Sequence, residues 1–525
     1  MISKRTLSGL PPWYFLVPAV FVGISVLLPL IYLVIRAFDG DWAQTSELVL
    51  RQRNLILLQN TLMLTGGVVL VTTLMAFPFA WLTTRTNVPG TKLMTLLGVM
   101  PLAIPGYVLA YSLLGVGGTN GTLAQLFGIV IDRPSGFWGS LLAISLYTFP
   151  YLFLNLRTGF MGLDPSVEEA ARSLGYNSRQ ILLKVILPQL RPAYLAGVLI
   201  ISLYVIGDFG AVSLMRYETF SYALFLQYES AFDRVYAAWI ALMLLALTST
   251  ILIAEYKLLK GLSLYRIGVG TARRTKITVL SNWGILLAWS YVIIVLTAAV
   301  VVPVVTILFW MAQGVDPFIW NSFGYAIRAS VTASAPAALL AIFFAVPLAY
   351  ISIRFPSRMS NYLQRFAYLG YATPPLALAL AFIFFSLSAL PFMYQTLALL
   401  VFAYALHFLA ESMGPVRSAL YQAPPRIEEA ARSMGVSRFR AFWLTTFPLL
   451  RNGIVAGAAF VFLSAMKELP ITFILSPIGF ETLAVSVWGY SAEAMFAEAA
   501  PFALSILFFS VLFVYLLFAR EWKKA

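Results

Sequence analysis

The chain has 525 residues, of which 61% are hydrophobic and only 11% are charged. A soluble domain is nearer half apolar and a quarter charged, so this composition excludes an ordinary soluble protein and indicates one that lies in a lipid bilayer. There are 35 Lys and Arg against 21 Asp and Glu, a single histidine and no cysteine, which excludes disulfides, thiolate metal sites and cysteine nucleophiles.

Twelve apolar runs are long enough to span a membrane, which takes roughly 20 helical residues for about 30 Å of hydrocarbon. The first half holds Trp13–Ile35, Asn60–Thr83, Leu93–Leu114, Phe137–Leu156, Pro192–Leu214 and Val235–Tyr256. The second half holds Trp283–Met311, Ala329–Ile353, Phe366–Leu387, Met393–Leu409, Gly453–Leu475 and Ala499–Phe518. The first run is too long for a signal-peptide core, so we expect it to be retained. The sequence predicts an all-α membrane protein with twelve transmembrane helices.

One polar segment occurs twice among these runs. Residues Glu168 to Leu190 read EEAARSLGYNSRQILLKVILPQL, and residues Glu428 to Leu450 read EEAARSMGVSRFRAFWLTTFPLL, an offset of 260 residues. Each copy follows the fourth run of its half. Two copies on the same side of a membrane require an even number of helices per repeat, so the chain reads as two parallel six-helix repeats. We expect the repeats at 1–256 and 283–525, a basic cytoplasmic linker at 257–282, and the polar segments at 164–190 and 424–450.

The distribution of Lys and Arg gives the orientation. If the N-terminus is inside, most of the 35 basic residues fall on inner segments, among them the linker, the C-terminal tail and both polar segments. Because inner loops of membrane proteins carry the excess of positive charge, we expect both termini and both polar segments in the cytoplasm.

The polar segment reads as a helix, a break and a second helix. In the first copy Asp164 can cap the first helix, Pro165 suits its first position and Gly175 can end it. Ser178, or Ser437 in the second copy, can then cap a further helix, which we expect to end before Pro188 or Pro448.

Charges and small residues suggest what the first of these helices does. Glu168 with Arg172, and Glu428 with Arg432, are spaced to form ion pairs along a helix. The paired alanines, Ala170 with Ala171 and Ala430 with Ala431, keep one face of the helix free of bulky side chains, so another protein could approach the helix closely. The segment therefore predicts a docking element. The alternative is an amphipathic surface helix with incidental charge, which the duplication disfavours.

The segment resembles the EAA signature of ABC importer permeases. The signature stands here as Glu169, Ala170, Ala171, Gly175 and Pro188, and again as Glu429, Ala430, Ala431, Gly435 and Pro448. Thr445 and Phe447 depart from the usual pattern in the second copy. The resemblance implies the type I ABC importer permease (MetI-like) fold, in which each segment is a coupling helix seated in a groove of an ATPase subunit.

The same resemblance implies partners and a location. We expect two ATPase (nucleotide-binding) subunits, an extracytoplasmic substrate-binding protein and a place in the bacterial inner membrane, with no nucleic-acid partner. The chain has no G-x-x-x-x-G-K-[ST] loop, so ATP and Mg would be bound by the partner subunits. We therefore expect a transport subunit that is not an enzyme and carries no cofactor of its own.

Several further segments resemble the fused permeases of ferric-iron importers. They are GDFGAVSLM at 207–215, RYETF at 216–220, MKELPITFIL at 466–475 and GFETLAVSVW at 479–488. Fused permeases for thiamine and for phosphonates share the architecture and remain alternatives. The resemblance implies import of ferric iron.

Three ionisable residues mark a possible translocation pathway or gate: Asp208, Lys467 and Glu468. Asp208 and Glu468 fall 39 residues after Glu169 and Glu429 respectively, in the fifth helix of their halves, and ionisable residues in a span are functional by default. They could form a helix-end ion pair that positions an outer gate or docks a binding protein, or their oxygens could ligate iron directly. No metal ligand is firmly assigned. We expect His407 to make a helix contact, and Glu255 and Glu411 to lie near inner helix ends.

Two other classes compete with this interpretation. A twelve-helix secondary transporter should carry a charged loop with an acid between its second and third helices, but that loop reads RTNVPGTK here. A polytopic membrane enzyme would need clustered His, Asp or Glu. Both classes leave the doubled segment unexplained.

Overall fold

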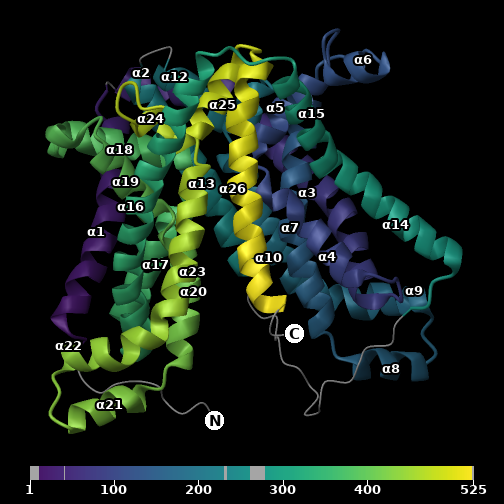
Figure 1. Ribbon diagram of the computed structural model, residues 1–525. Helices are drawn as coiled ribbons and strands as arrows, with labels where there is room; N and C mark the ends of the chain where they lie inside the picture. The colour runs from purple at the N-terminus through teal and green to yellow at the C-terminus, as the bar shows by residue number, and fades with distance from the viewer. Residues whose placement is uncertain (1–10, 41, 230–232, 260–277, 523–525) are drawn as a thin grey trace.

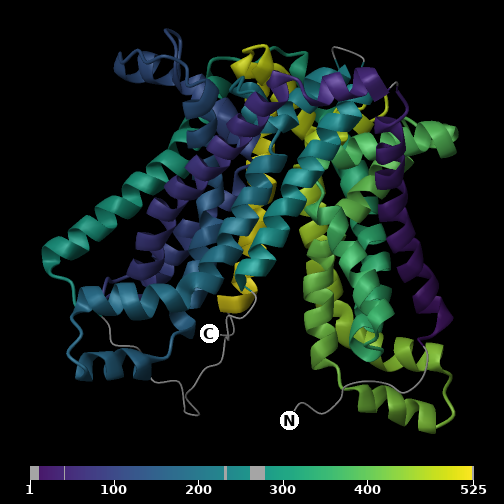
Figure 2. The same ribbon diagram turned by 180° about the vertical axis from the view of Figure 1, so that it is seen from behind.

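The computed structural model describes residues 11–40, 42–229, 233–259 and 278–522. For residues 42–45 and 514–522 it describes the backbone alone. Figure 1 shows a helical bundle whose two limbs are joined at one end and diverge toward the other, and Figure 2 shows the same divergence from behind. The helices α8 and α21 lie at the diverging end, one on each limb.

Nine helices of the described residues are long and apolar enough to span a membrane. They are α1 (Trp13–Ala37), α3 (Gln52–Arg85), α7 (Gly136–Gly162), the run Ser178–Gly207, α13 (Arg234–Leu259), the run Asn282–Ala312, α16 (Ile319–Arg354), the run Arg438–Met466 and α26 (Phe496–Trp522). Three bent helix pairs bring the number of spans in the described residues to twelve when each pair is counted as one span. The prediction of an all-α protein with twelve spans is confirmed.

The third span of each half is broken at proline. In the first half α4 (Thr91–Val99) and the 3-10 turn Met100–Ala103 meet α5 (Gly106–Val116) at 89°, next to Pro105. In the second half α17 (Arg358–Ala372) meets α18 (Pro375–Ala389) at 108°. Proline lacks an amide hydrogen and disfavours helix at the residue before it, so both spans break at corresponding prolines.

The tenth span is longer than predicted. Helix α19 (Leu397–His407) bends by 51° into α20 (Leu409–Gln422), so this span continues 13 residues beyond Leu409. Polar residues such as Glu411 and Arg417 had masked its second part. Glu411 therefore lies in the first turn of α20, not near the inner end of a span as expected.

Short helices complete the bundle. At the end opposite α8 and α21 lie α2 (Trp42–Val49), α6 (Thr122–Phe127), α12 (Phe220–Glu229), α24 (Pro470–Leu475) and α25 (Leu483–Ala492). Helix α11 (Gly210–Leu214) follows the fifth span, and the turn Pro391–Met393 follows α18.

The first span of each half packs on the other half. Helix α1 runs along α16, α17 and α18 (Figure 1). The seventh span, formed by α14 (Asn282–Leu296), a π turn at Thr297–Val301 and α15 (Val302–Ala312), packs against α3, α4 and α5. The repeats are therefore interlocked. Most of the expected linker, residues 260–277, lies outside the described residues, and Thr278 at its end pairs with Thr86.

His407 makes the helix contact that the sequence predicts. Its Nδ1 lies 3.0 Å from the carbonyl oxygen of Gly370, and the ring is buried. The two helices meet closely here, since a Cβ added to Gly370 would lie 2.7 Å from the carbonyl oxygen of Leu406.

We expect Gly370→Ala to lower the free energy of unfolding by about 1–3 kcal/mol, because the added methyl group must push α17 away from α19. Thermal unfolding of the purified chain in detergent measures the effect. Gly324→Ala in α16 is the matched control, since nothing lies within 4 Å of its Cβ position. Equal loss of stability in both variants would contradict the close crossing.

Candidate coupling site and outer closure

The duplicated segment forms two matching helices, α8 (Pro165–Ser173) and α21 (Pro425–Ser433). Asp164 caps the first through its Oδ1, which accepts a 3.0 Å bond from the amide of Ser166. Both helices end in the same turn, because Gly175 and Gly435 adopt φ angles of +85° and +86°. The amides of Tyr176 and Val436 then return to the carbonyls of Ala171 and Ala431. The predicted helix and glycine break are present in both copies.

The second helix of each copy differs from the prediction. In the first copy α9 (Ser178–Ile181), a π turn at Leu182–Ile186 and α10 (Leu187–Gly207) form one continuous helix. The second copy repeats this with α22 (Arg438–Ala441), a π turn at Phe442–Thr446 and α23 (Phe447–Met466).

Pro188 and Pro448 therefore do not end a helix. Each π turn stands just before its proline, where a regular turn would bring the ring against the carbonyl four residues earlier. Asn177, and not Ser178, caps the first copy in a capping box with Gln180, whereas Ser437 caps the second as expected. The second helix of each polar segment is thus continuous with the fifth span of its half.

The first glutamate of α8 faces the protein and not water. Glu168 is 5% exposed, and its Oε1 accepts a 2.7 Å bond from Nη1 of Arg85 at the end of α3. Arg172 approaches the other oxygen at 3.9 Å. The predicted pair with Arg172 is therefore the weaker partner of a buried ion pair that joins α8 to the second span. Ala171 is also buried, so of the two alanines only Ala170 contributes a small side chain to the exposed face of the helix.

The second copy holds the equivalent carboxylate with different donors. Glu428 is 2% exposed and accepts bonds from the hydroxyls of Tyr350 at 2.5 Å and Thr446 at 3.0 Å. Ile186 stands at the position equivalent to Thr446 and cannot donate. The predicted pair of Glu428 with Arg432 is not among the ion pairs of the described residues, and α21 is anchored through hydroxyl groups.

Other members of the duplicated segment face outward. Glu169 and Glu429 are exposed, as are Ala170 and Ala430. Leu174 and Met434, each just before its glycine, are both 77% exposed. The two copies therefore expose apolar side chains at matching positions.

Aromatic packing explains the departure at Phe447. Its ring lies 4.3 Å from that of Trp443, and Phe439 and Phe442 of the same turn contact Tyr14 and Phe15 at the start of α1. The second copy thus packs against α1, the first span of the other half. Thr445 bonds back to the carbonyl of Ala441 at 2.7 Å, and we find no further structural reason for it.

Asp208 and Glu468 occupy equivalent turns just after the fifth span of each half. Asp208 Oδ1 accepts bonds from the amides of Ala211 and Val212, and its Oδ2 accepts one from Tyr147 at 3.2 Å. Glu468 Oε1 accepts a 3.0 Å bond from the amide of Ile471. These acids cap short helices, which supports a positioning role near a gate over direct iron ligation. Lys467 interacts electrostatically with Glu411 and Glu468, and its carbonyl accepts a bond from Tyr107 of the other half.

Four aromatic rings close the interface between the halves at the end opposite α8 and α21. Phe209 and Phe225 come from the first half, and Phe473 and Trp488 from the second. Phe473 lies 5.2 Å from Phe225 and 4.8 Å from Trp488, and the indole of Trp488 donates a 2.8 Å bond to Ser213. We call these four rings the outer aromatic cluster.

We expect Trp488→Ala to open this end, because it removes a partly buried indole that packs against Phe209, Phe225 and Phe473. The chain has no native cysteine, so a single Ala223→Cys, at a buried position on the same helix as Phe225, reports the opening. A membrane-impermeant thiol reagent should label this cysteine only in the Trp488→Ala background. Equal labelling with Trp488 intact would show that the rings do not close this end.

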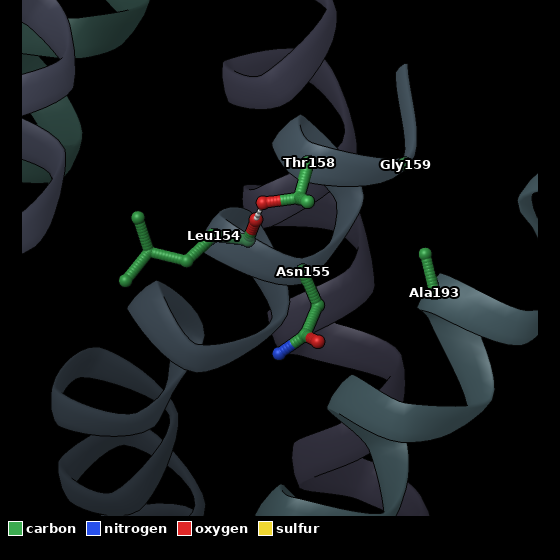
Figure 3. A pocket seen from close by; sticks show the side chains of 5 residues that line it. All are labelled: Leu154, Asn155, Thr158, Gly159 and Ala193. Atoms are coloured by element: carbon green, nitrogen blue, oxygen red, sulfur yellow. Dashed lines mark hydrogen bonds between the residues drawn. The ribbon is translucent and has the colours of Figure 1, made fainter. Parts of the chain in front are cut away.

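Two small hollows lie at equivalent places on the fourth spans. Figure 3 shows the first, of about 380 Å³, lined by Leu154, Asn155, Thr158, Gly159 and Ala193. The second, of about 300 Å³, is lined by Tyr368, Gly414, Arg417, Ser418 and Tyr421. In the first, the amide nitrogen of Asn155 and the hydroxyl of Thr158 donate to carbonyls of their own helix. Neither lining contains an acid, and we assign no ligand to them.

Sequence reasoning passed over four residues that the structure brings together between the halves: Tyr151, Tyr204, Tyr371 and Glu411. Because the chain has 26 tyrosines, a tyrosine by itself does not indicate a functional site. The repeat offset of 260 residues would have singled out one pair, because it aligns Glu411 of the second half with Tyr151 of the first.

The comparisons with known proteins agree with this architecture. The family model described as "Binding-protein-dependent transport system inner membrane component" matches residues 73–260 and 337–522. The chain is 29% identical over 510 residues, 97% of its length and 98% of the relative's, to the Fe(3+)-transport system permease protein FbpB 2 of Haemophilus influenzae. It is 23% identical to the ferric transport system permease protein FbpB of Actinobacillus pleuropneumoniae, covering 84% of this chain and 68% of that one.

A further relative matches one half only. The sulfate transport system permease protein CysT of Salmonella typhimurium is 29% identical over 233 residues, 43% of this chain and 84% of that one. The family model covers most of both halves and includes both coupling segments and their fifth spans. The chain therefore belongs to the binding-protein-dependent transport system inner membrane components, the membrane permeases of ABC transporters, as a fused protein with two repeats.

Proposed function

We propose that this chain is the translocating subunit of an ATP-driven importer that carries ferric iron into the bacterial cytoplasm. The observation that carries the proposal is the pair of coupling helices. They stand on both limbs at one end of the bundle, are anchored by buried carboxylates and expose matching apolar tips. Two sites of this kind fit two ATPase subunits, one under each limb.

The proposed mechanism is alternating access. When two ATPase subunits close on ATP, they draw α8 and α21 together. Each of these helices is joined by its glycine turn to a helix that continues through a π turn into the fifth span of its half. Movement of the coupling helices would therefore reach the turns at Asp208 and Glu468 and the outer aromatic cluster. A binding protein would deliver its cargo at that outer end, with both termini on the ATPase side.

Ferric iron is favoured by the extent of similarity. The Haemophilus relative named for Fe(3+) transport aligns with nearly the whole of both chains. The sulfate relative aligns with one half. In this scheme ATP and Mg belong to the partner subunits.

Uptake by the assembled transporter tests the substrate. The chain is reconstituted in vesicles with its partner ATPase and binding protein, and labelled ferric iron, thiamine and sulfate are supplied in turn. We expect ATP-dependent uptake of iron alone. Uptake of thiamine or sulfate without iron would contradict the substrate and leave the permease assignment intact.

A further inference from the structure

The two halves place a polar pair at the same positions between their fourth and fifth spans. In the first half Tyr151 on α7 donates a 3.0 Å bond to Tyr204 on α10, and the two rings are stacked 4.8 Å apart. In the second half the equivalent positions hold Glu411 on α20 and Ser464 on α23, whose side chains lie together. The duplication therefore puts oxygen atoms on both sides of the interface between the halves.

These pairs meet across that interface. The hydroxyl of Tyr204 lies 3.4 Å from the hydroxyl of Tyr371 on α17, which belongs to the second half. The Glu411 carboxylate interacts electrostatically with the phenols of Tyr151, Tyr204 and Tyr371. We call these four residues the oxygen cluster.

The oxygen cluster borders accessible space and holds an unsatisfied oxygen. Tyr371 is 36% exposed, and the other three side chains are partly exposed. Oε2 of Glu411 is nevertheless buried and has no hydrogen-bond partner. A buried carboxylate oxygen without a protein donor is costly, and this oxygen is free to accept a donor or to ligate a cation.

Charge at this place suits a cation. Glu411 and Glu468 face one ammonium group, that of Lys467, so the carboxylates outnumber it. Within the described ranges no three His, Cys, Asp or Glu side chains gather in a way that could hold a metal ion. A metal cation that passes between the halves would therefore find its oxygen ligands chiefly among phenols.

We propose that the oxygen cluster is a transient waypoint for the transported ferric ion, held by the phenol oxygens of Tyr151, Tyr204 and Tyr371 and by the Glu411 carboxylate. A trivalent cation is hard and prefers anionic oxygen ligands. As each phenol binds, its O–H bond breaks, an Fe–O bond forms and the proton passes to water, while the Glu411 carboxylate stays ionised as a ligand. No oxidation or reduction takes place. The inference rests on the proposed transport of ferric iron.

The competing explanation is that the phenols only fasten the halves together. A ligand role and a fastening role differ in one observable, since iron bound to phenolate has a visible charge-transfer absorption that a hydrogen bond between phenols does not produce.

The test uses the full chain purified in detergent and titrated with the ferric complex of nitrilotriacetate. We expect a saturable visible band in the native chain. Tyr204→Phe and Glu411→Gln should weaken binding about tenfold or more. Tyr371→Phe alters the most exposed ring of the cluster, so it serves if the other variants fail to fold. Tyr194→Phe is the matched control, because Tyr194 lies on the same helix and contacts Thr73 outside the cluster.

Two results would overturn the waypoint: no band in the native chain, or an unchanged band in both Tyr204→Phe and Tyr371→Phe. Uptake separates this failure from failure of the proposed function. Normal iron uptake by Tyr204→Phe would refute the waypoint and leave iron transport standing. Native transporters that import thiamine or sulfate and not iron would refute the function itself.

Discussion

Gly435→Val is expected to reduce ATP-driven uptake to background, whereas Gly435→Asn should keep part of it. Gly435 has a φ of +86°, and nothing lies within 4 Å of its Cβ position. The penalty is therefore one of backbone strain, about 1–2 kcal/mol for an ordinary side chain and less for Asn. Val should displace the exposed tip at Met434 from the surface that the ATPase covers. Uptake into vesicles and co-purification of the ATPase measure the effect.

The equivalent change in the first copy tests whether the two coupling helices contribute equally to uptake. Gly175→Val meets the same geometry, so it should give the same loss if both limbs are driven. Glu429→Arg, at an exposed position, should also detach the ATPase without changing the thermal stability of the chain. Full uptake and normal ATPase binding in Gly435→Val and Glu429→Arg would refute the coupling role.

Arg85→Met is expected to lower the free energy of unfolding by about 3–5 kcal/mol, because it leaves the buried Glu168 charge without its partner. The remaining polar atoms of Arg85, Nε and Nη2, are buried without hydrogen-bond partners and its guanidinium lies 5.8 Å from the ring centre of Phe160. The pair with Glu168 is thus its main polar contact. Thermal unfolding in detergent measures the loss.

Two variants show whether the charge is responsible. Adding Glu168→Leu to Arg85→Met should restore much of the stability, since a well-packed apolar pair can replace a buried ion pair. Tyr350→Phe removes one donor from Glu428 and should cost only about 1–3 kcal/mol, because Thr446 still donates. If Arg85→Met cost no more than Tyr350→Phe, the ion pair would not anchor α8.

Local patterns predicted the fold well and its packing poorly. Apolar runs gave all twelve spans, and the paired EEAARS segments gave the duplication, because both signals lie in contiguous sequence. The packing of each first span on the opposite half was not predictable, since the residues of α1 that contact the second half are ordinary apolar residues. The proline positions were seen but misread, because a π turn allows a helix to continue where a regular turn would not.

At the candidate site, glycines and caps were predictable and partners were not. Gly175 and Gly435 carry a conformational requirement that spacing reveals. Glu168 and Glu428 were predicted to pair within their own helices, because their observed partners, Arg85 and Tyr350, lie 83 and 78 residues away in sequence. The oxygen cluster was missed for the same reason, since it forms only where four spans meet.

The central claim is that α8 and α21 each receive one ATPase subunit. The chain has no cysteine, so Glu169→Cys and Glu429→Cys can each carry a single photo-crosslinker in the assembled transporter. The account predicts that each labelled position captures one ATPase subunit, that the double variant captures two, and that Thr119→Cys, exposed at the opposite end, captures none. Failure to capture the ATPase from either helix, or capture from Thr119→Cys alone, would contradict it.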